Sequence, residues 1–251
     1  MITKDSTIGL MSDVDANTAK TIILEEITIS TATPELPSPL LTASGKLTNA
    51  ALVLVKIRSK CGIEGHSYLF SPNATLLTAL ASAVSVAFEE VKGRSCSPET
   101  NTDYLLDKFK LFGGTGILTM AFAAIDMASW DLVGHALGKP LYRLWGGEKT
   151  SIPSYESSGL SIGHISQVLD QAKTFLNNGN TRMKVRLGYE TVTEEVLLLS
   201  GLKDELGNNI ELMVVSSPQI MYHFLIEFLE LAVLCLGLGE GGCDYTALAI
   251  Y

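Results

Sequence analysis

The chain has 251 residues, of which 47% are hydrophobic and 18% are charged, and its formal net charge at pH 7 is −9. This acidic balance excludes the clustered basic surface that binding to nucleic acid requires. The length allows one large domain or two small ones. The four cysteines show no metal-ligand spacing and indicate reduced thiols. Residues 1–20 are polar, lack the apolar core of a signal peptide and predict a disordered or weakly ordered N-terminus of a cytoplasmic protein.

The first half of the chain predicts strands followed by helices. Residues 21–32 are rich in β-branched side chains, which is typical of a strand, and three prolines then predict a loop over residues 34–49. Residues 51–59 and 63–70 indicate the two strands of a hairpin. Helices are predicted at 74–91, 103–111 and 117–137. Strands first and helices second indicate an α+β domain.

The helix predicted over residues 117–137 has the most regular pattern, because its apolar residues return at steps of three and four. Thr115 is the predicted N-cap, and Gly138 suits a left-handed residue after the helix end. Taken alone, the stretch allows two interpretations of equal weight. It is either a functional signature or a buried helix whose Asp126 and Asp131 merely face solvent or cap neighbouring groups.

After residue 147 the predicted elements alternate. Strands are expected at 151–160, 182–187 and 210–216, and helices at 165–177 and 191–206. Thr191 and Glu194 have the spacing of a capping box. Alternating strands and helices of this length predict a parallel sheet covered by helices.

Residues 220–239 are apolar enough to raise the alternative of a membrane span. Glu227 and Glu230 interrupt the run, and charges are costly inside a bilayer. We therefore predict a buried or amphipathic helix and no membrane partner.

Several stretches, in a fixed order, carry a resemblance to a known family. Ala-Ala-Ile-Asp-Met-Ala-Ser-Trp-Asp occupies residues 123–131, and Gly-Lys-Pro-Leu-Tyr-Arg-Leu-Trp-Gly-Gly follows at 138–147. Together they resemble the signature that joins the two domains in the mandelate racemase and muconate lactonizing enzyme family of the enolase superfamily. Residues 39–45 are similar to the mobile loop over that family's active site, residues 65–70 to a hairpin strand of the mandelate racemases, and residues 183–189 to the second barrel strand.

The resemblance implies a two-part fold and a reaction. The fold would be an α+β capping domain at residues 21–147, followed at 148–251 by an incomplete (β/α) TIM-type barrel of about three to four βα units. The family removes the proton α to a carboxylate with the help of Mg²⁺, as racemases or acid-sugar dehydratases. Leu40 in the loop and Phe70 at the end of the hairpin strand would contact the substrate.

The residues expected to carry the proton transfer depart from the family pattern. The family has Lys-x-Lys on the second barrel strand, with the second lysine as the base, whereas this chain has Lys184 and Arg186. Strand alternation would point both side chains into the barrel. A guanidinium with a pKa above about 12 is not a usable proton acceptor, although it can bind a carboxylate through two parallel hydrogen bonds. The alternative is two positive charges held by unidentified acids at a strand end.

The expected metal ligands also depart from the pattern. Where the family's third strand ends in Asp-x-Asn, Val215 stands at the first ligand position and Ser217 replaces the Asn. An isopropyl group cannot coordinate a cation that prefers oxygen ligands. Glu240 is the candidate for the second ligand, its alternative being a solvated carboxylate in a glycine-rich stretch. Residues 151–251 are fewer than the roughly 250 of a full barrel, and residues 218–251 lose the resemblance, so we expect a truncated, degenerate barrel.

Three functions remain open at this point. The first is an isomerase or lyase acting on a 2-hydroxy acid or acid sugar. The second is a non-catalytic, truncated relative or fragment that binds a partner or small acid. The third is a chain that pairs its open sheet with another copy, because an uncovered strand is a template for pairing. We favour a family member by descent that is catalytically impaired, binds magnesium weakly if at all, takes a small carboxylate and self-associates.

Overall fold

The computed structural model describes residues 13–42, 45–71, 73–148, 151–207 and 210–215. The chain divides into two compact units, with boundaries after residues 35, 48 and 150. Among the described residues, the first unit holds a three-stranded sheet and its helices, and the second holds two two-stranded sheets and two further helices.

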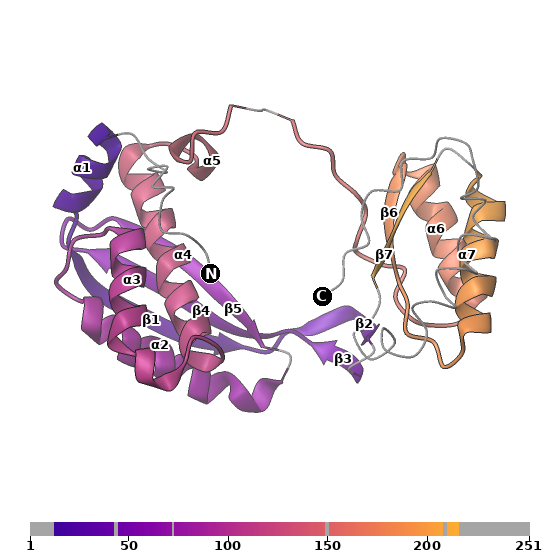
Figure 1. Ribbon diagram of the computed structural model, residues 1–251, viewed down its shortest axis with the longest axis horizontal. Helices are drawn as coiled ribbons and strands as arrows, with labels where there is room; N and C mark the ends of the chain where they lie inside the picture. Colours follow the sequence, from indigo (N-terminus) through magenta and orange to yellow (C-terminus); the bar gives the residue numbers. More distant parts are fainter. Residues whose placement is uncertain (1–12, 43–44, 72, 149–150, 208–209, 216–251) are drawn as a thin grey trace. The chain divides into compact units, whose positions relative to one another are not determined.

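The first unit is built on a three-stranded antiparallel sheet in the order β1-β4-β5 (Figure 1). Its strands are β1 (Leu24–Ala32), β4 (Ala51–Ser59) and β5 (Glu64–Ser71). The Ser59 hydroxyl donates to the carbonyl of Ile63 and accepts from its N–H, both at 3.0 Å, and so closes the turn between β4 and β5. The predicted hairpin is therefore confirmed.

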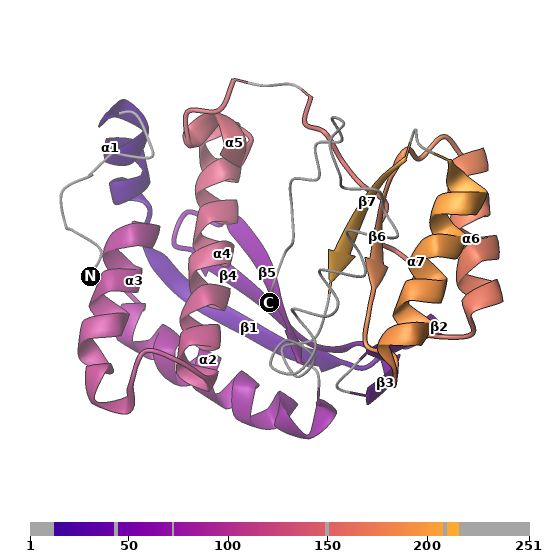
Figure 2. The ribbon, with the colours of Figure 1, turned by 45° about the vertical axis from the view of Figure 1, so that its right-hand side comes forward.

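Helices pack on one face of this sheet (Figures 1 and 2). They are α1 (Asp13–Thr21), α2 (Leu77–Val91) with the turn η1 (Ala74–Leu76) before it, α3 (Pro98–Lys108) with η2 (Lys110–Phe112) after it, α4 (Ile117–Leu137) and α5 (Leu141–Leu144). Val53, Ile57, Phe88, Ile125 and Leu132 are buried in the shared core. Residues 74–91 and 117–137 would be long and apolar enough to cross a membrane by composition alone, but here they supply much of this core.

The bounds of α4 agree with the predicted helix. Of the two predicted capping residues, the one at the C-terminal end is confirmed and the one at the N-terminal end is not. Gly138 follows the helix in a left-handed conformation with φ 62°, as expected. The N-cap is Gly116 rather than the predicted Thr115, and no side chain caps the first turn. The prediction of Thr115 as the cap was wrong because the turn at Gly116, with φ 90°, shifts the helix start by one residue.

Two segments of the N-terminal third differ from the predictions. Residues 34–49, expected to be a loop, contain β2 (Glu35–Thr42) and β3 (Gly45–Asn49), which pair as a two-stranded sheet. Both strands of such a sheet are edges, where prolines that lack an N–H are tolerated. Residues 13–20, expected to be disordered or weakly ordered, lie in α1, because Asp15 is buried there and both its oxygens accept from Lys139, at 2.8 and 3.0 Å.

The second unit contains parallel βα units. Helix α6 (Ile165–Asn177), strand β6 (Arg182–Arg186), helix α7 (Val192–Leu206) and strand β7 (Glu211–Val215) follow one another, and β6 and β7 pair in parallel. Thr191 and Glu194 form the predicted capping box. The α+β capping domain and partial barrel predicted from the sequence are thus the observed fold classes.

The strand predicted at residues 151–160 is reduced to a single parallel bridge between Glu156 and Met183. Pro153 has no N–H to donate to a ladder, and the Glu156 carboxylate accepts the N–H of Ser158 at 2.8 Å, which forms a local turn in place of a continuous strand. The predicted helix at 220–239 lies outside the described residues.

Strand β5 and helix α4 lie in close contact at Gly65. A Cβ atom on Gly65 would be 2.1 Å from the Ala128 carbonyl oxygen and 2.5 Å from the Leu132 nitrogen. On either side of Gly65, Asp131 accepts the N–H of His66 at 2.8 Å, and His135 Nδ1 donates to the Glu64 carbonyl at 2.8 Å. Helix α4 therefore supplies the hydrogen bonds that a further strand would have given to the edge of β5.

We predict that Gly65→Ala lowers the free energy of unfolding by about 3 kcal/mol or more, because the methyl group meets helix backbone, which cannot rotate away. Gly114→Ala is the matched control, since a Cβ there meets nothing within 4 Å. Chemical denaturation of both variants is the measurement. Equal stability of the two variants would contradict this description of the contact.

Candidate carboxylate site on strand β6

The side chains of β6 separate onto two faces. Met183 and Val185 are fully buried in a core formed with α6 and α7. Arg182, Lys184 and Arg186 alternate with them and are partly exposed. Because successive side chains of a strand point to opposite faces, the three basic residues share the face that is turned away from the two helices.

The three cations have different register partners on the neighbouring strand β7. Arg182 pairs in register with Glu211, and its Nε lies 2.7 Å from that carboxylate. Lys184 pairs with Met213 and Arg186 with Val215. No ion pair joins a carboxylate to either of these two residues in the part of the chain that the structure describes. The unidentified acids of the alternative interpretation are thus absent there.

Neutral groups hold the two remaining cations. The Lys184 ammonium lies 5.6 Å from the centre of the Tyr155 ring. Arg186 Nη1 donates to the Gly159 carbonyl at 2.8 Å, which leaves its other N–H donors for a ligand. A guanidinium and an ammonium on one strand face, at the C-terminal end of a parallel strand, are suited to bind a carboxylate.

A buried carboxylate contacts the loop that follows β6. Glu195 on α7 is 2% exposed, and its Oε1 accepts the N–H of Gly188 at 2.9 Å and of Tyr189 at 3.3 Å. Burial raises the pKa of the Glu195 carboxyl, against the effect of the two N–H donors, and the charge of Glu194 adds to the rise. The sequence analysis did not identify Glu195. The signal was available, because a lone Glu in the buried stripe of Leu198, Leu199 and Leu202 is unusual.

The other predicted site residues belong to other elements or lie outside the described residues. Leu40 lies in β2, in the second unit. Phe70 lies in β5, in the first unit, and is 44% exposed opposite Leu52 of β4. Val215 is the register partner of Arg186. Glu240 and Ser217 lie outside the described residues.

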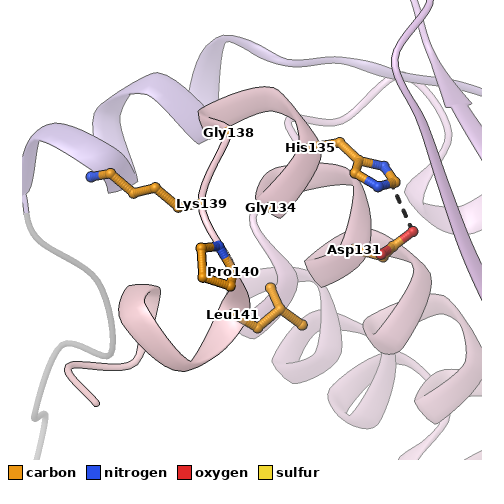
Figure 3. Close-up of a pocket in the computed structure, with 7 residues that line it drawn as sticks. All are labelled: Asp131, Gly134, His135, Gly138, Lys139, Pro140 and Leu141. Atoms are coloured by element: carbon orange, nitrogen blue, oxygen red, sulfur yellow. Dashed lines mark ion pairs between the residues drawn. The ribbon is translucent and has the colours of Figure 1, made fainter. Parts of the chain in front are cut away.

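A depression of about 400 Å³ lies at the C-terminal end of α4 (Figure 3). Asp131, His135 and Lys139 line it. Each of these side chains is already engaged, Asp131 by the N–H of His66, His135 by the Glu64 carbonyl and Lys139 by Asp15. We assign these three residues to the packing of the first unit rather than to a second site.

Fold and site together define a protein class: an α+β capping unit followed by the βα units of a barrel, with a basic face at the end of one barrel strand. Residues 25–146 match the family model of the mandelate racemase / muconate lactonizing enzyme N-terminal domain. The chain thus carries the N-terminal domain of the mandelate racemase / muconate lactonizing enzyme family.

Known relatives extend the match beyond the capping unit. The L-talarate/galactarate dehydratase of Salmonella typhimurium is 28% identical over 190 residues, which are 75% of this chain and 48% of the relative. The D-gluconate/D-galactonate dehydratase of Picrophilus torridus is 34% identical over 110 residues, 38% of this chain and 27% of the relative. The crystal structure of an enolase from Bradyrhizobium, complexed with magnesium and mandelic acid, has a TM-score of 0.74 and 26% identity, covering 84% of this chain and 59% of its own. The chain thus spans about half the length of the first of these relatives.

The raised pKa of Glu195 predicts a dependence of stability on pH. A carboxyl with a raised pKa binds its proton more tightly in the folded state, so it stabilises the fold below its ordinary pKa and loses this contribution as the pH rises through the raised value. We expect the free energy of unfolding of the wild type to fall, relative to that of Glu195→Gln, as the pH rises from about 4.5. Glu205→Gln, on the outer side of the same helix, is the control for loss of charge. Parallel stability curves for wild type and Glu195→Gln would contradict the assignment.

Proposed function

We propose that this chain is a mandelate racemase-like protein that binds a small carboxylate between Lys184 and Arg186, and that it is impaired in the family reaction. The observation that carries the proposal is the register of β6 with β7. Among the residues that the structure describes, an acid pairs with Arg182 alone of the three basic residues on this face, and the two nearest the C-terminal end of the strand have apolar partners. Two uncompensated cations repel each other unless an anion binds.

The relatives support a carboxylate as the ligand. Mandelic acid is bound in the Bradyrhizobium enolase, and talarate, galactarate, gluconate and galactonate in the names of the related dehydratases are all carboxylates. Lys184 would meet the carboxylate as a point charge, and Arg186 would bind it with its free N–H donors.

The impairment follows from the two residue types at the end of this face. By the resemblance, Arg186 stands at the position of the family's base, and a guanidinium stays protonated at any pH at which the protein is folded. General base catalysis needs a group whose pKa lies near the working pH. Lys184 retains the charge that binds a carboxylate, so binding and proton abstraction are separated in this chain.

The described part of the site does not fit the magnesium ion of the family. Val215 presents an apolar side chain beside Arg186, at the position of the first ligand. In the described ranges, no group of three or more His, Cys, Asp or Glu side chains could hold a metal ion. Mg²⁺ binds through carboxylate and other oxygen ligands in octahedral geometry, and these residues offer none at the end of β7.

We expect mandelate and galactarate, used as probes, to shift the amide NMR signals of residues 184–187. Lys184→Ala and Arg186→Gln should each weaken the affinity about tenfold, because each removes a charge-assisted hydrogen bond. Arg182→Gln is the matched control on the same face, since its charge is already neutralised by Glu211, and Lys173→Ala is a second control on the helix surface. Titration is followed by NMR. Equal losses in Arg182→Gln and Arg186→Gln would contradict a site at the end of the strand.

We also predict that Mg²⁺ binds this face with a dissociation constant weaker than about 100 μM, or a binding free energy weaker than about −5.5 kcal/mol. The reason is the valine at the first ligand position. Isothermal titration calorimetry measures the constant, and Glu240→Ala shows whether any tight binding uses that residue. Tight binding that Glu240→Ala weakens would place a magnesium site in this chain and would contradict the prediction.

The second candidate function is self-association of a non-catalytic relative. Its support is the apolar content of the same region, where Ile152 is 78% exposed and Tyr155 is 44% exposed. Large exposed apolar patches mark interaction surfaces in soluble proteins. If a second copy covers this face, the affinity for carboxylate probes falls as the protein concentration rises, which distinguishes the two functions.

A further inference from the structure

Two loops at the C-terminal end of the parallel strands are each held by a side chain of the helix that follows. In the first loop, the N–H of Leu160 donates to Gln171 Oε1 of α6 at 2.7 Å. In the second, the N–H groups of Gly188 and Tyr189 donate to Glu195 Oε1 of α7. In both loops, a side-chain oxygen of the following helix accepts hydrogen bonds from backbone N–H groups of the loop.

The first loop has a strained backbone. Leu160 has a φ of 50°, the one positive value among the non-glycine residues that the structure describes, and its side chain is fully buried. Such a conformation costs on the order of 1–3 kcal/mol and persists where surrounding contacts hold it in place. Gln171 and the buried position of Leu160 supply these contacts.

The two loops are joined to each other and to Arg186. The Tyr189 hydroxyl accepts the N–H of Gly163 at 3.3 Å, which links the second loop to the first. The first loop in turn accepts from Arg186 twice, at the Leu160 carbonyl from the backbone N–H, 3.0 Å, and at the Gly159 carbonyl from the guanidinium. Glu195 is therefore connected to the guanidinium by three hydrogen bonds, at Tyr189, Gly163 and Gly159, and by the backbone of the first loop, which joins Gly163 to Gly159.

We propose that Glu195 is a positioning residue for the carboxylate site: it holds the loop after β6 and, through Tyr189, sets the orientation of the Arg186 guanidinium. The inference rests on the proposed function, because Glu195 would act on the carboxylate through Arg186. Its Oε1 holds two N–H donors at a point two and three residues beyond Arg186. Loss of this acceptor frees the backbone that directs the guanidinium, and bidentate binding of a carboxylate depends on the orientation of the planar group.

A side chain that only stabilises the fold would give a different pattern of effects. It would lower the free energy of unfolding but leave the affinity of the folded molecules for mandelate unchanged. It would also act equally in the presence and absence of Arg186. A double-mutant cycle separates the two cases, because coupling to Arg186 appears only if the residues act together.

The experiment measures mandelate affinity by NMR titration for wild type, Glu195→Ala, Glu195→Gln and Tyr189→Phe, each also in an Arg186→Gln background. Glu195→Gln keeps an oxygen acceptor at Oε1 and should stay within about twofold of wild type. Glu195→Ala should lose about fivefold or more, the value of about one hydrogen bond, and this loss should vanish when Arg186 is replaced. Tyr189→Phe should lose about threefold and carries the test if Glu195→Ala does not fold.

The outcomes separate the two proposals. Unchanged affinity in both Glu195→Ala and Tyr189→Phe, or equal losses with and without Arg186, overturns the positioning role while the carboxylate site stands. If the wild type binds no carboxylate, the proposed function fails, and amide hydrogen exchange then decides the role of Glu195. If Glu195 holds the loop, protection of the Gly188 and Tyr189 amides stays in Glu195→Gln and falls in Glu195→Ala and Tyr189→Phe. Equal protection in all four proteins overturns this hold on the loop and with it the positioning role.

Discussion

The contact of strand β5 with helix α4 is the constraint on which the first unit depends. Because Gly65 has no side chain, the backbone of α4 at Ala128 lies directly on the strand. Asp131 and His135, one helical turn apart, then satisfy the edge backbone on either side of the glycine. An edge strand with unpaired groups is prone to association, so the helix that carries the family signature closes this edge. Asp131 is therefore a packing residue, as one of the two initial interpretations of the helix allowed.

In the second unit, strand alternation places the basic side chains of β6 and its buried apolar side chains on opposite faces. Met183 and Val185 are buried against the helices, and the same alternation leaves Lys184 and Arg186 on the other face. The second strand then decides which charges are neutralised, because parallel register brings an acid beside Arg182 and apolar residues beside the other two. Charge without a partner is costly for stability and useful for binding, which is the usual balance at functional sites.

Local patterns in the sequence predicted most of the fold. Periodic apolar residues located α4 to the residue, the bounds predicted for α6 also agree, and a Thr and a Glu three apart located the start of α7. The predictions that were wrong concern backbone pairing within two short segments, which the residue types alone did not determine. Residues 34–49 form strands because they pair with each other, and residues 151–160 lose theirs to a local turn at Glu156. For the site, alternation put Lys184 and Arg186 on one face, but the pairing of Arg182 needed the register. The contacts of Glu195 needed the folded loops.

The central claim is that this face binds a carboxylate without removing its α-proton. The most direct test follows the ¹H NMR signal of the α-proton of mandelate in D₂O, with the protein and Mg²⁺ present, while the amide signals of β6 report binding. The account predicts that the β6 signals shift and that the α-proton signal keeps its intensity, because the group at the base position is a guanidinium. Exchange of the α-proton for deuterium by the wild type, absent in Lys184→Ala, would contradict it.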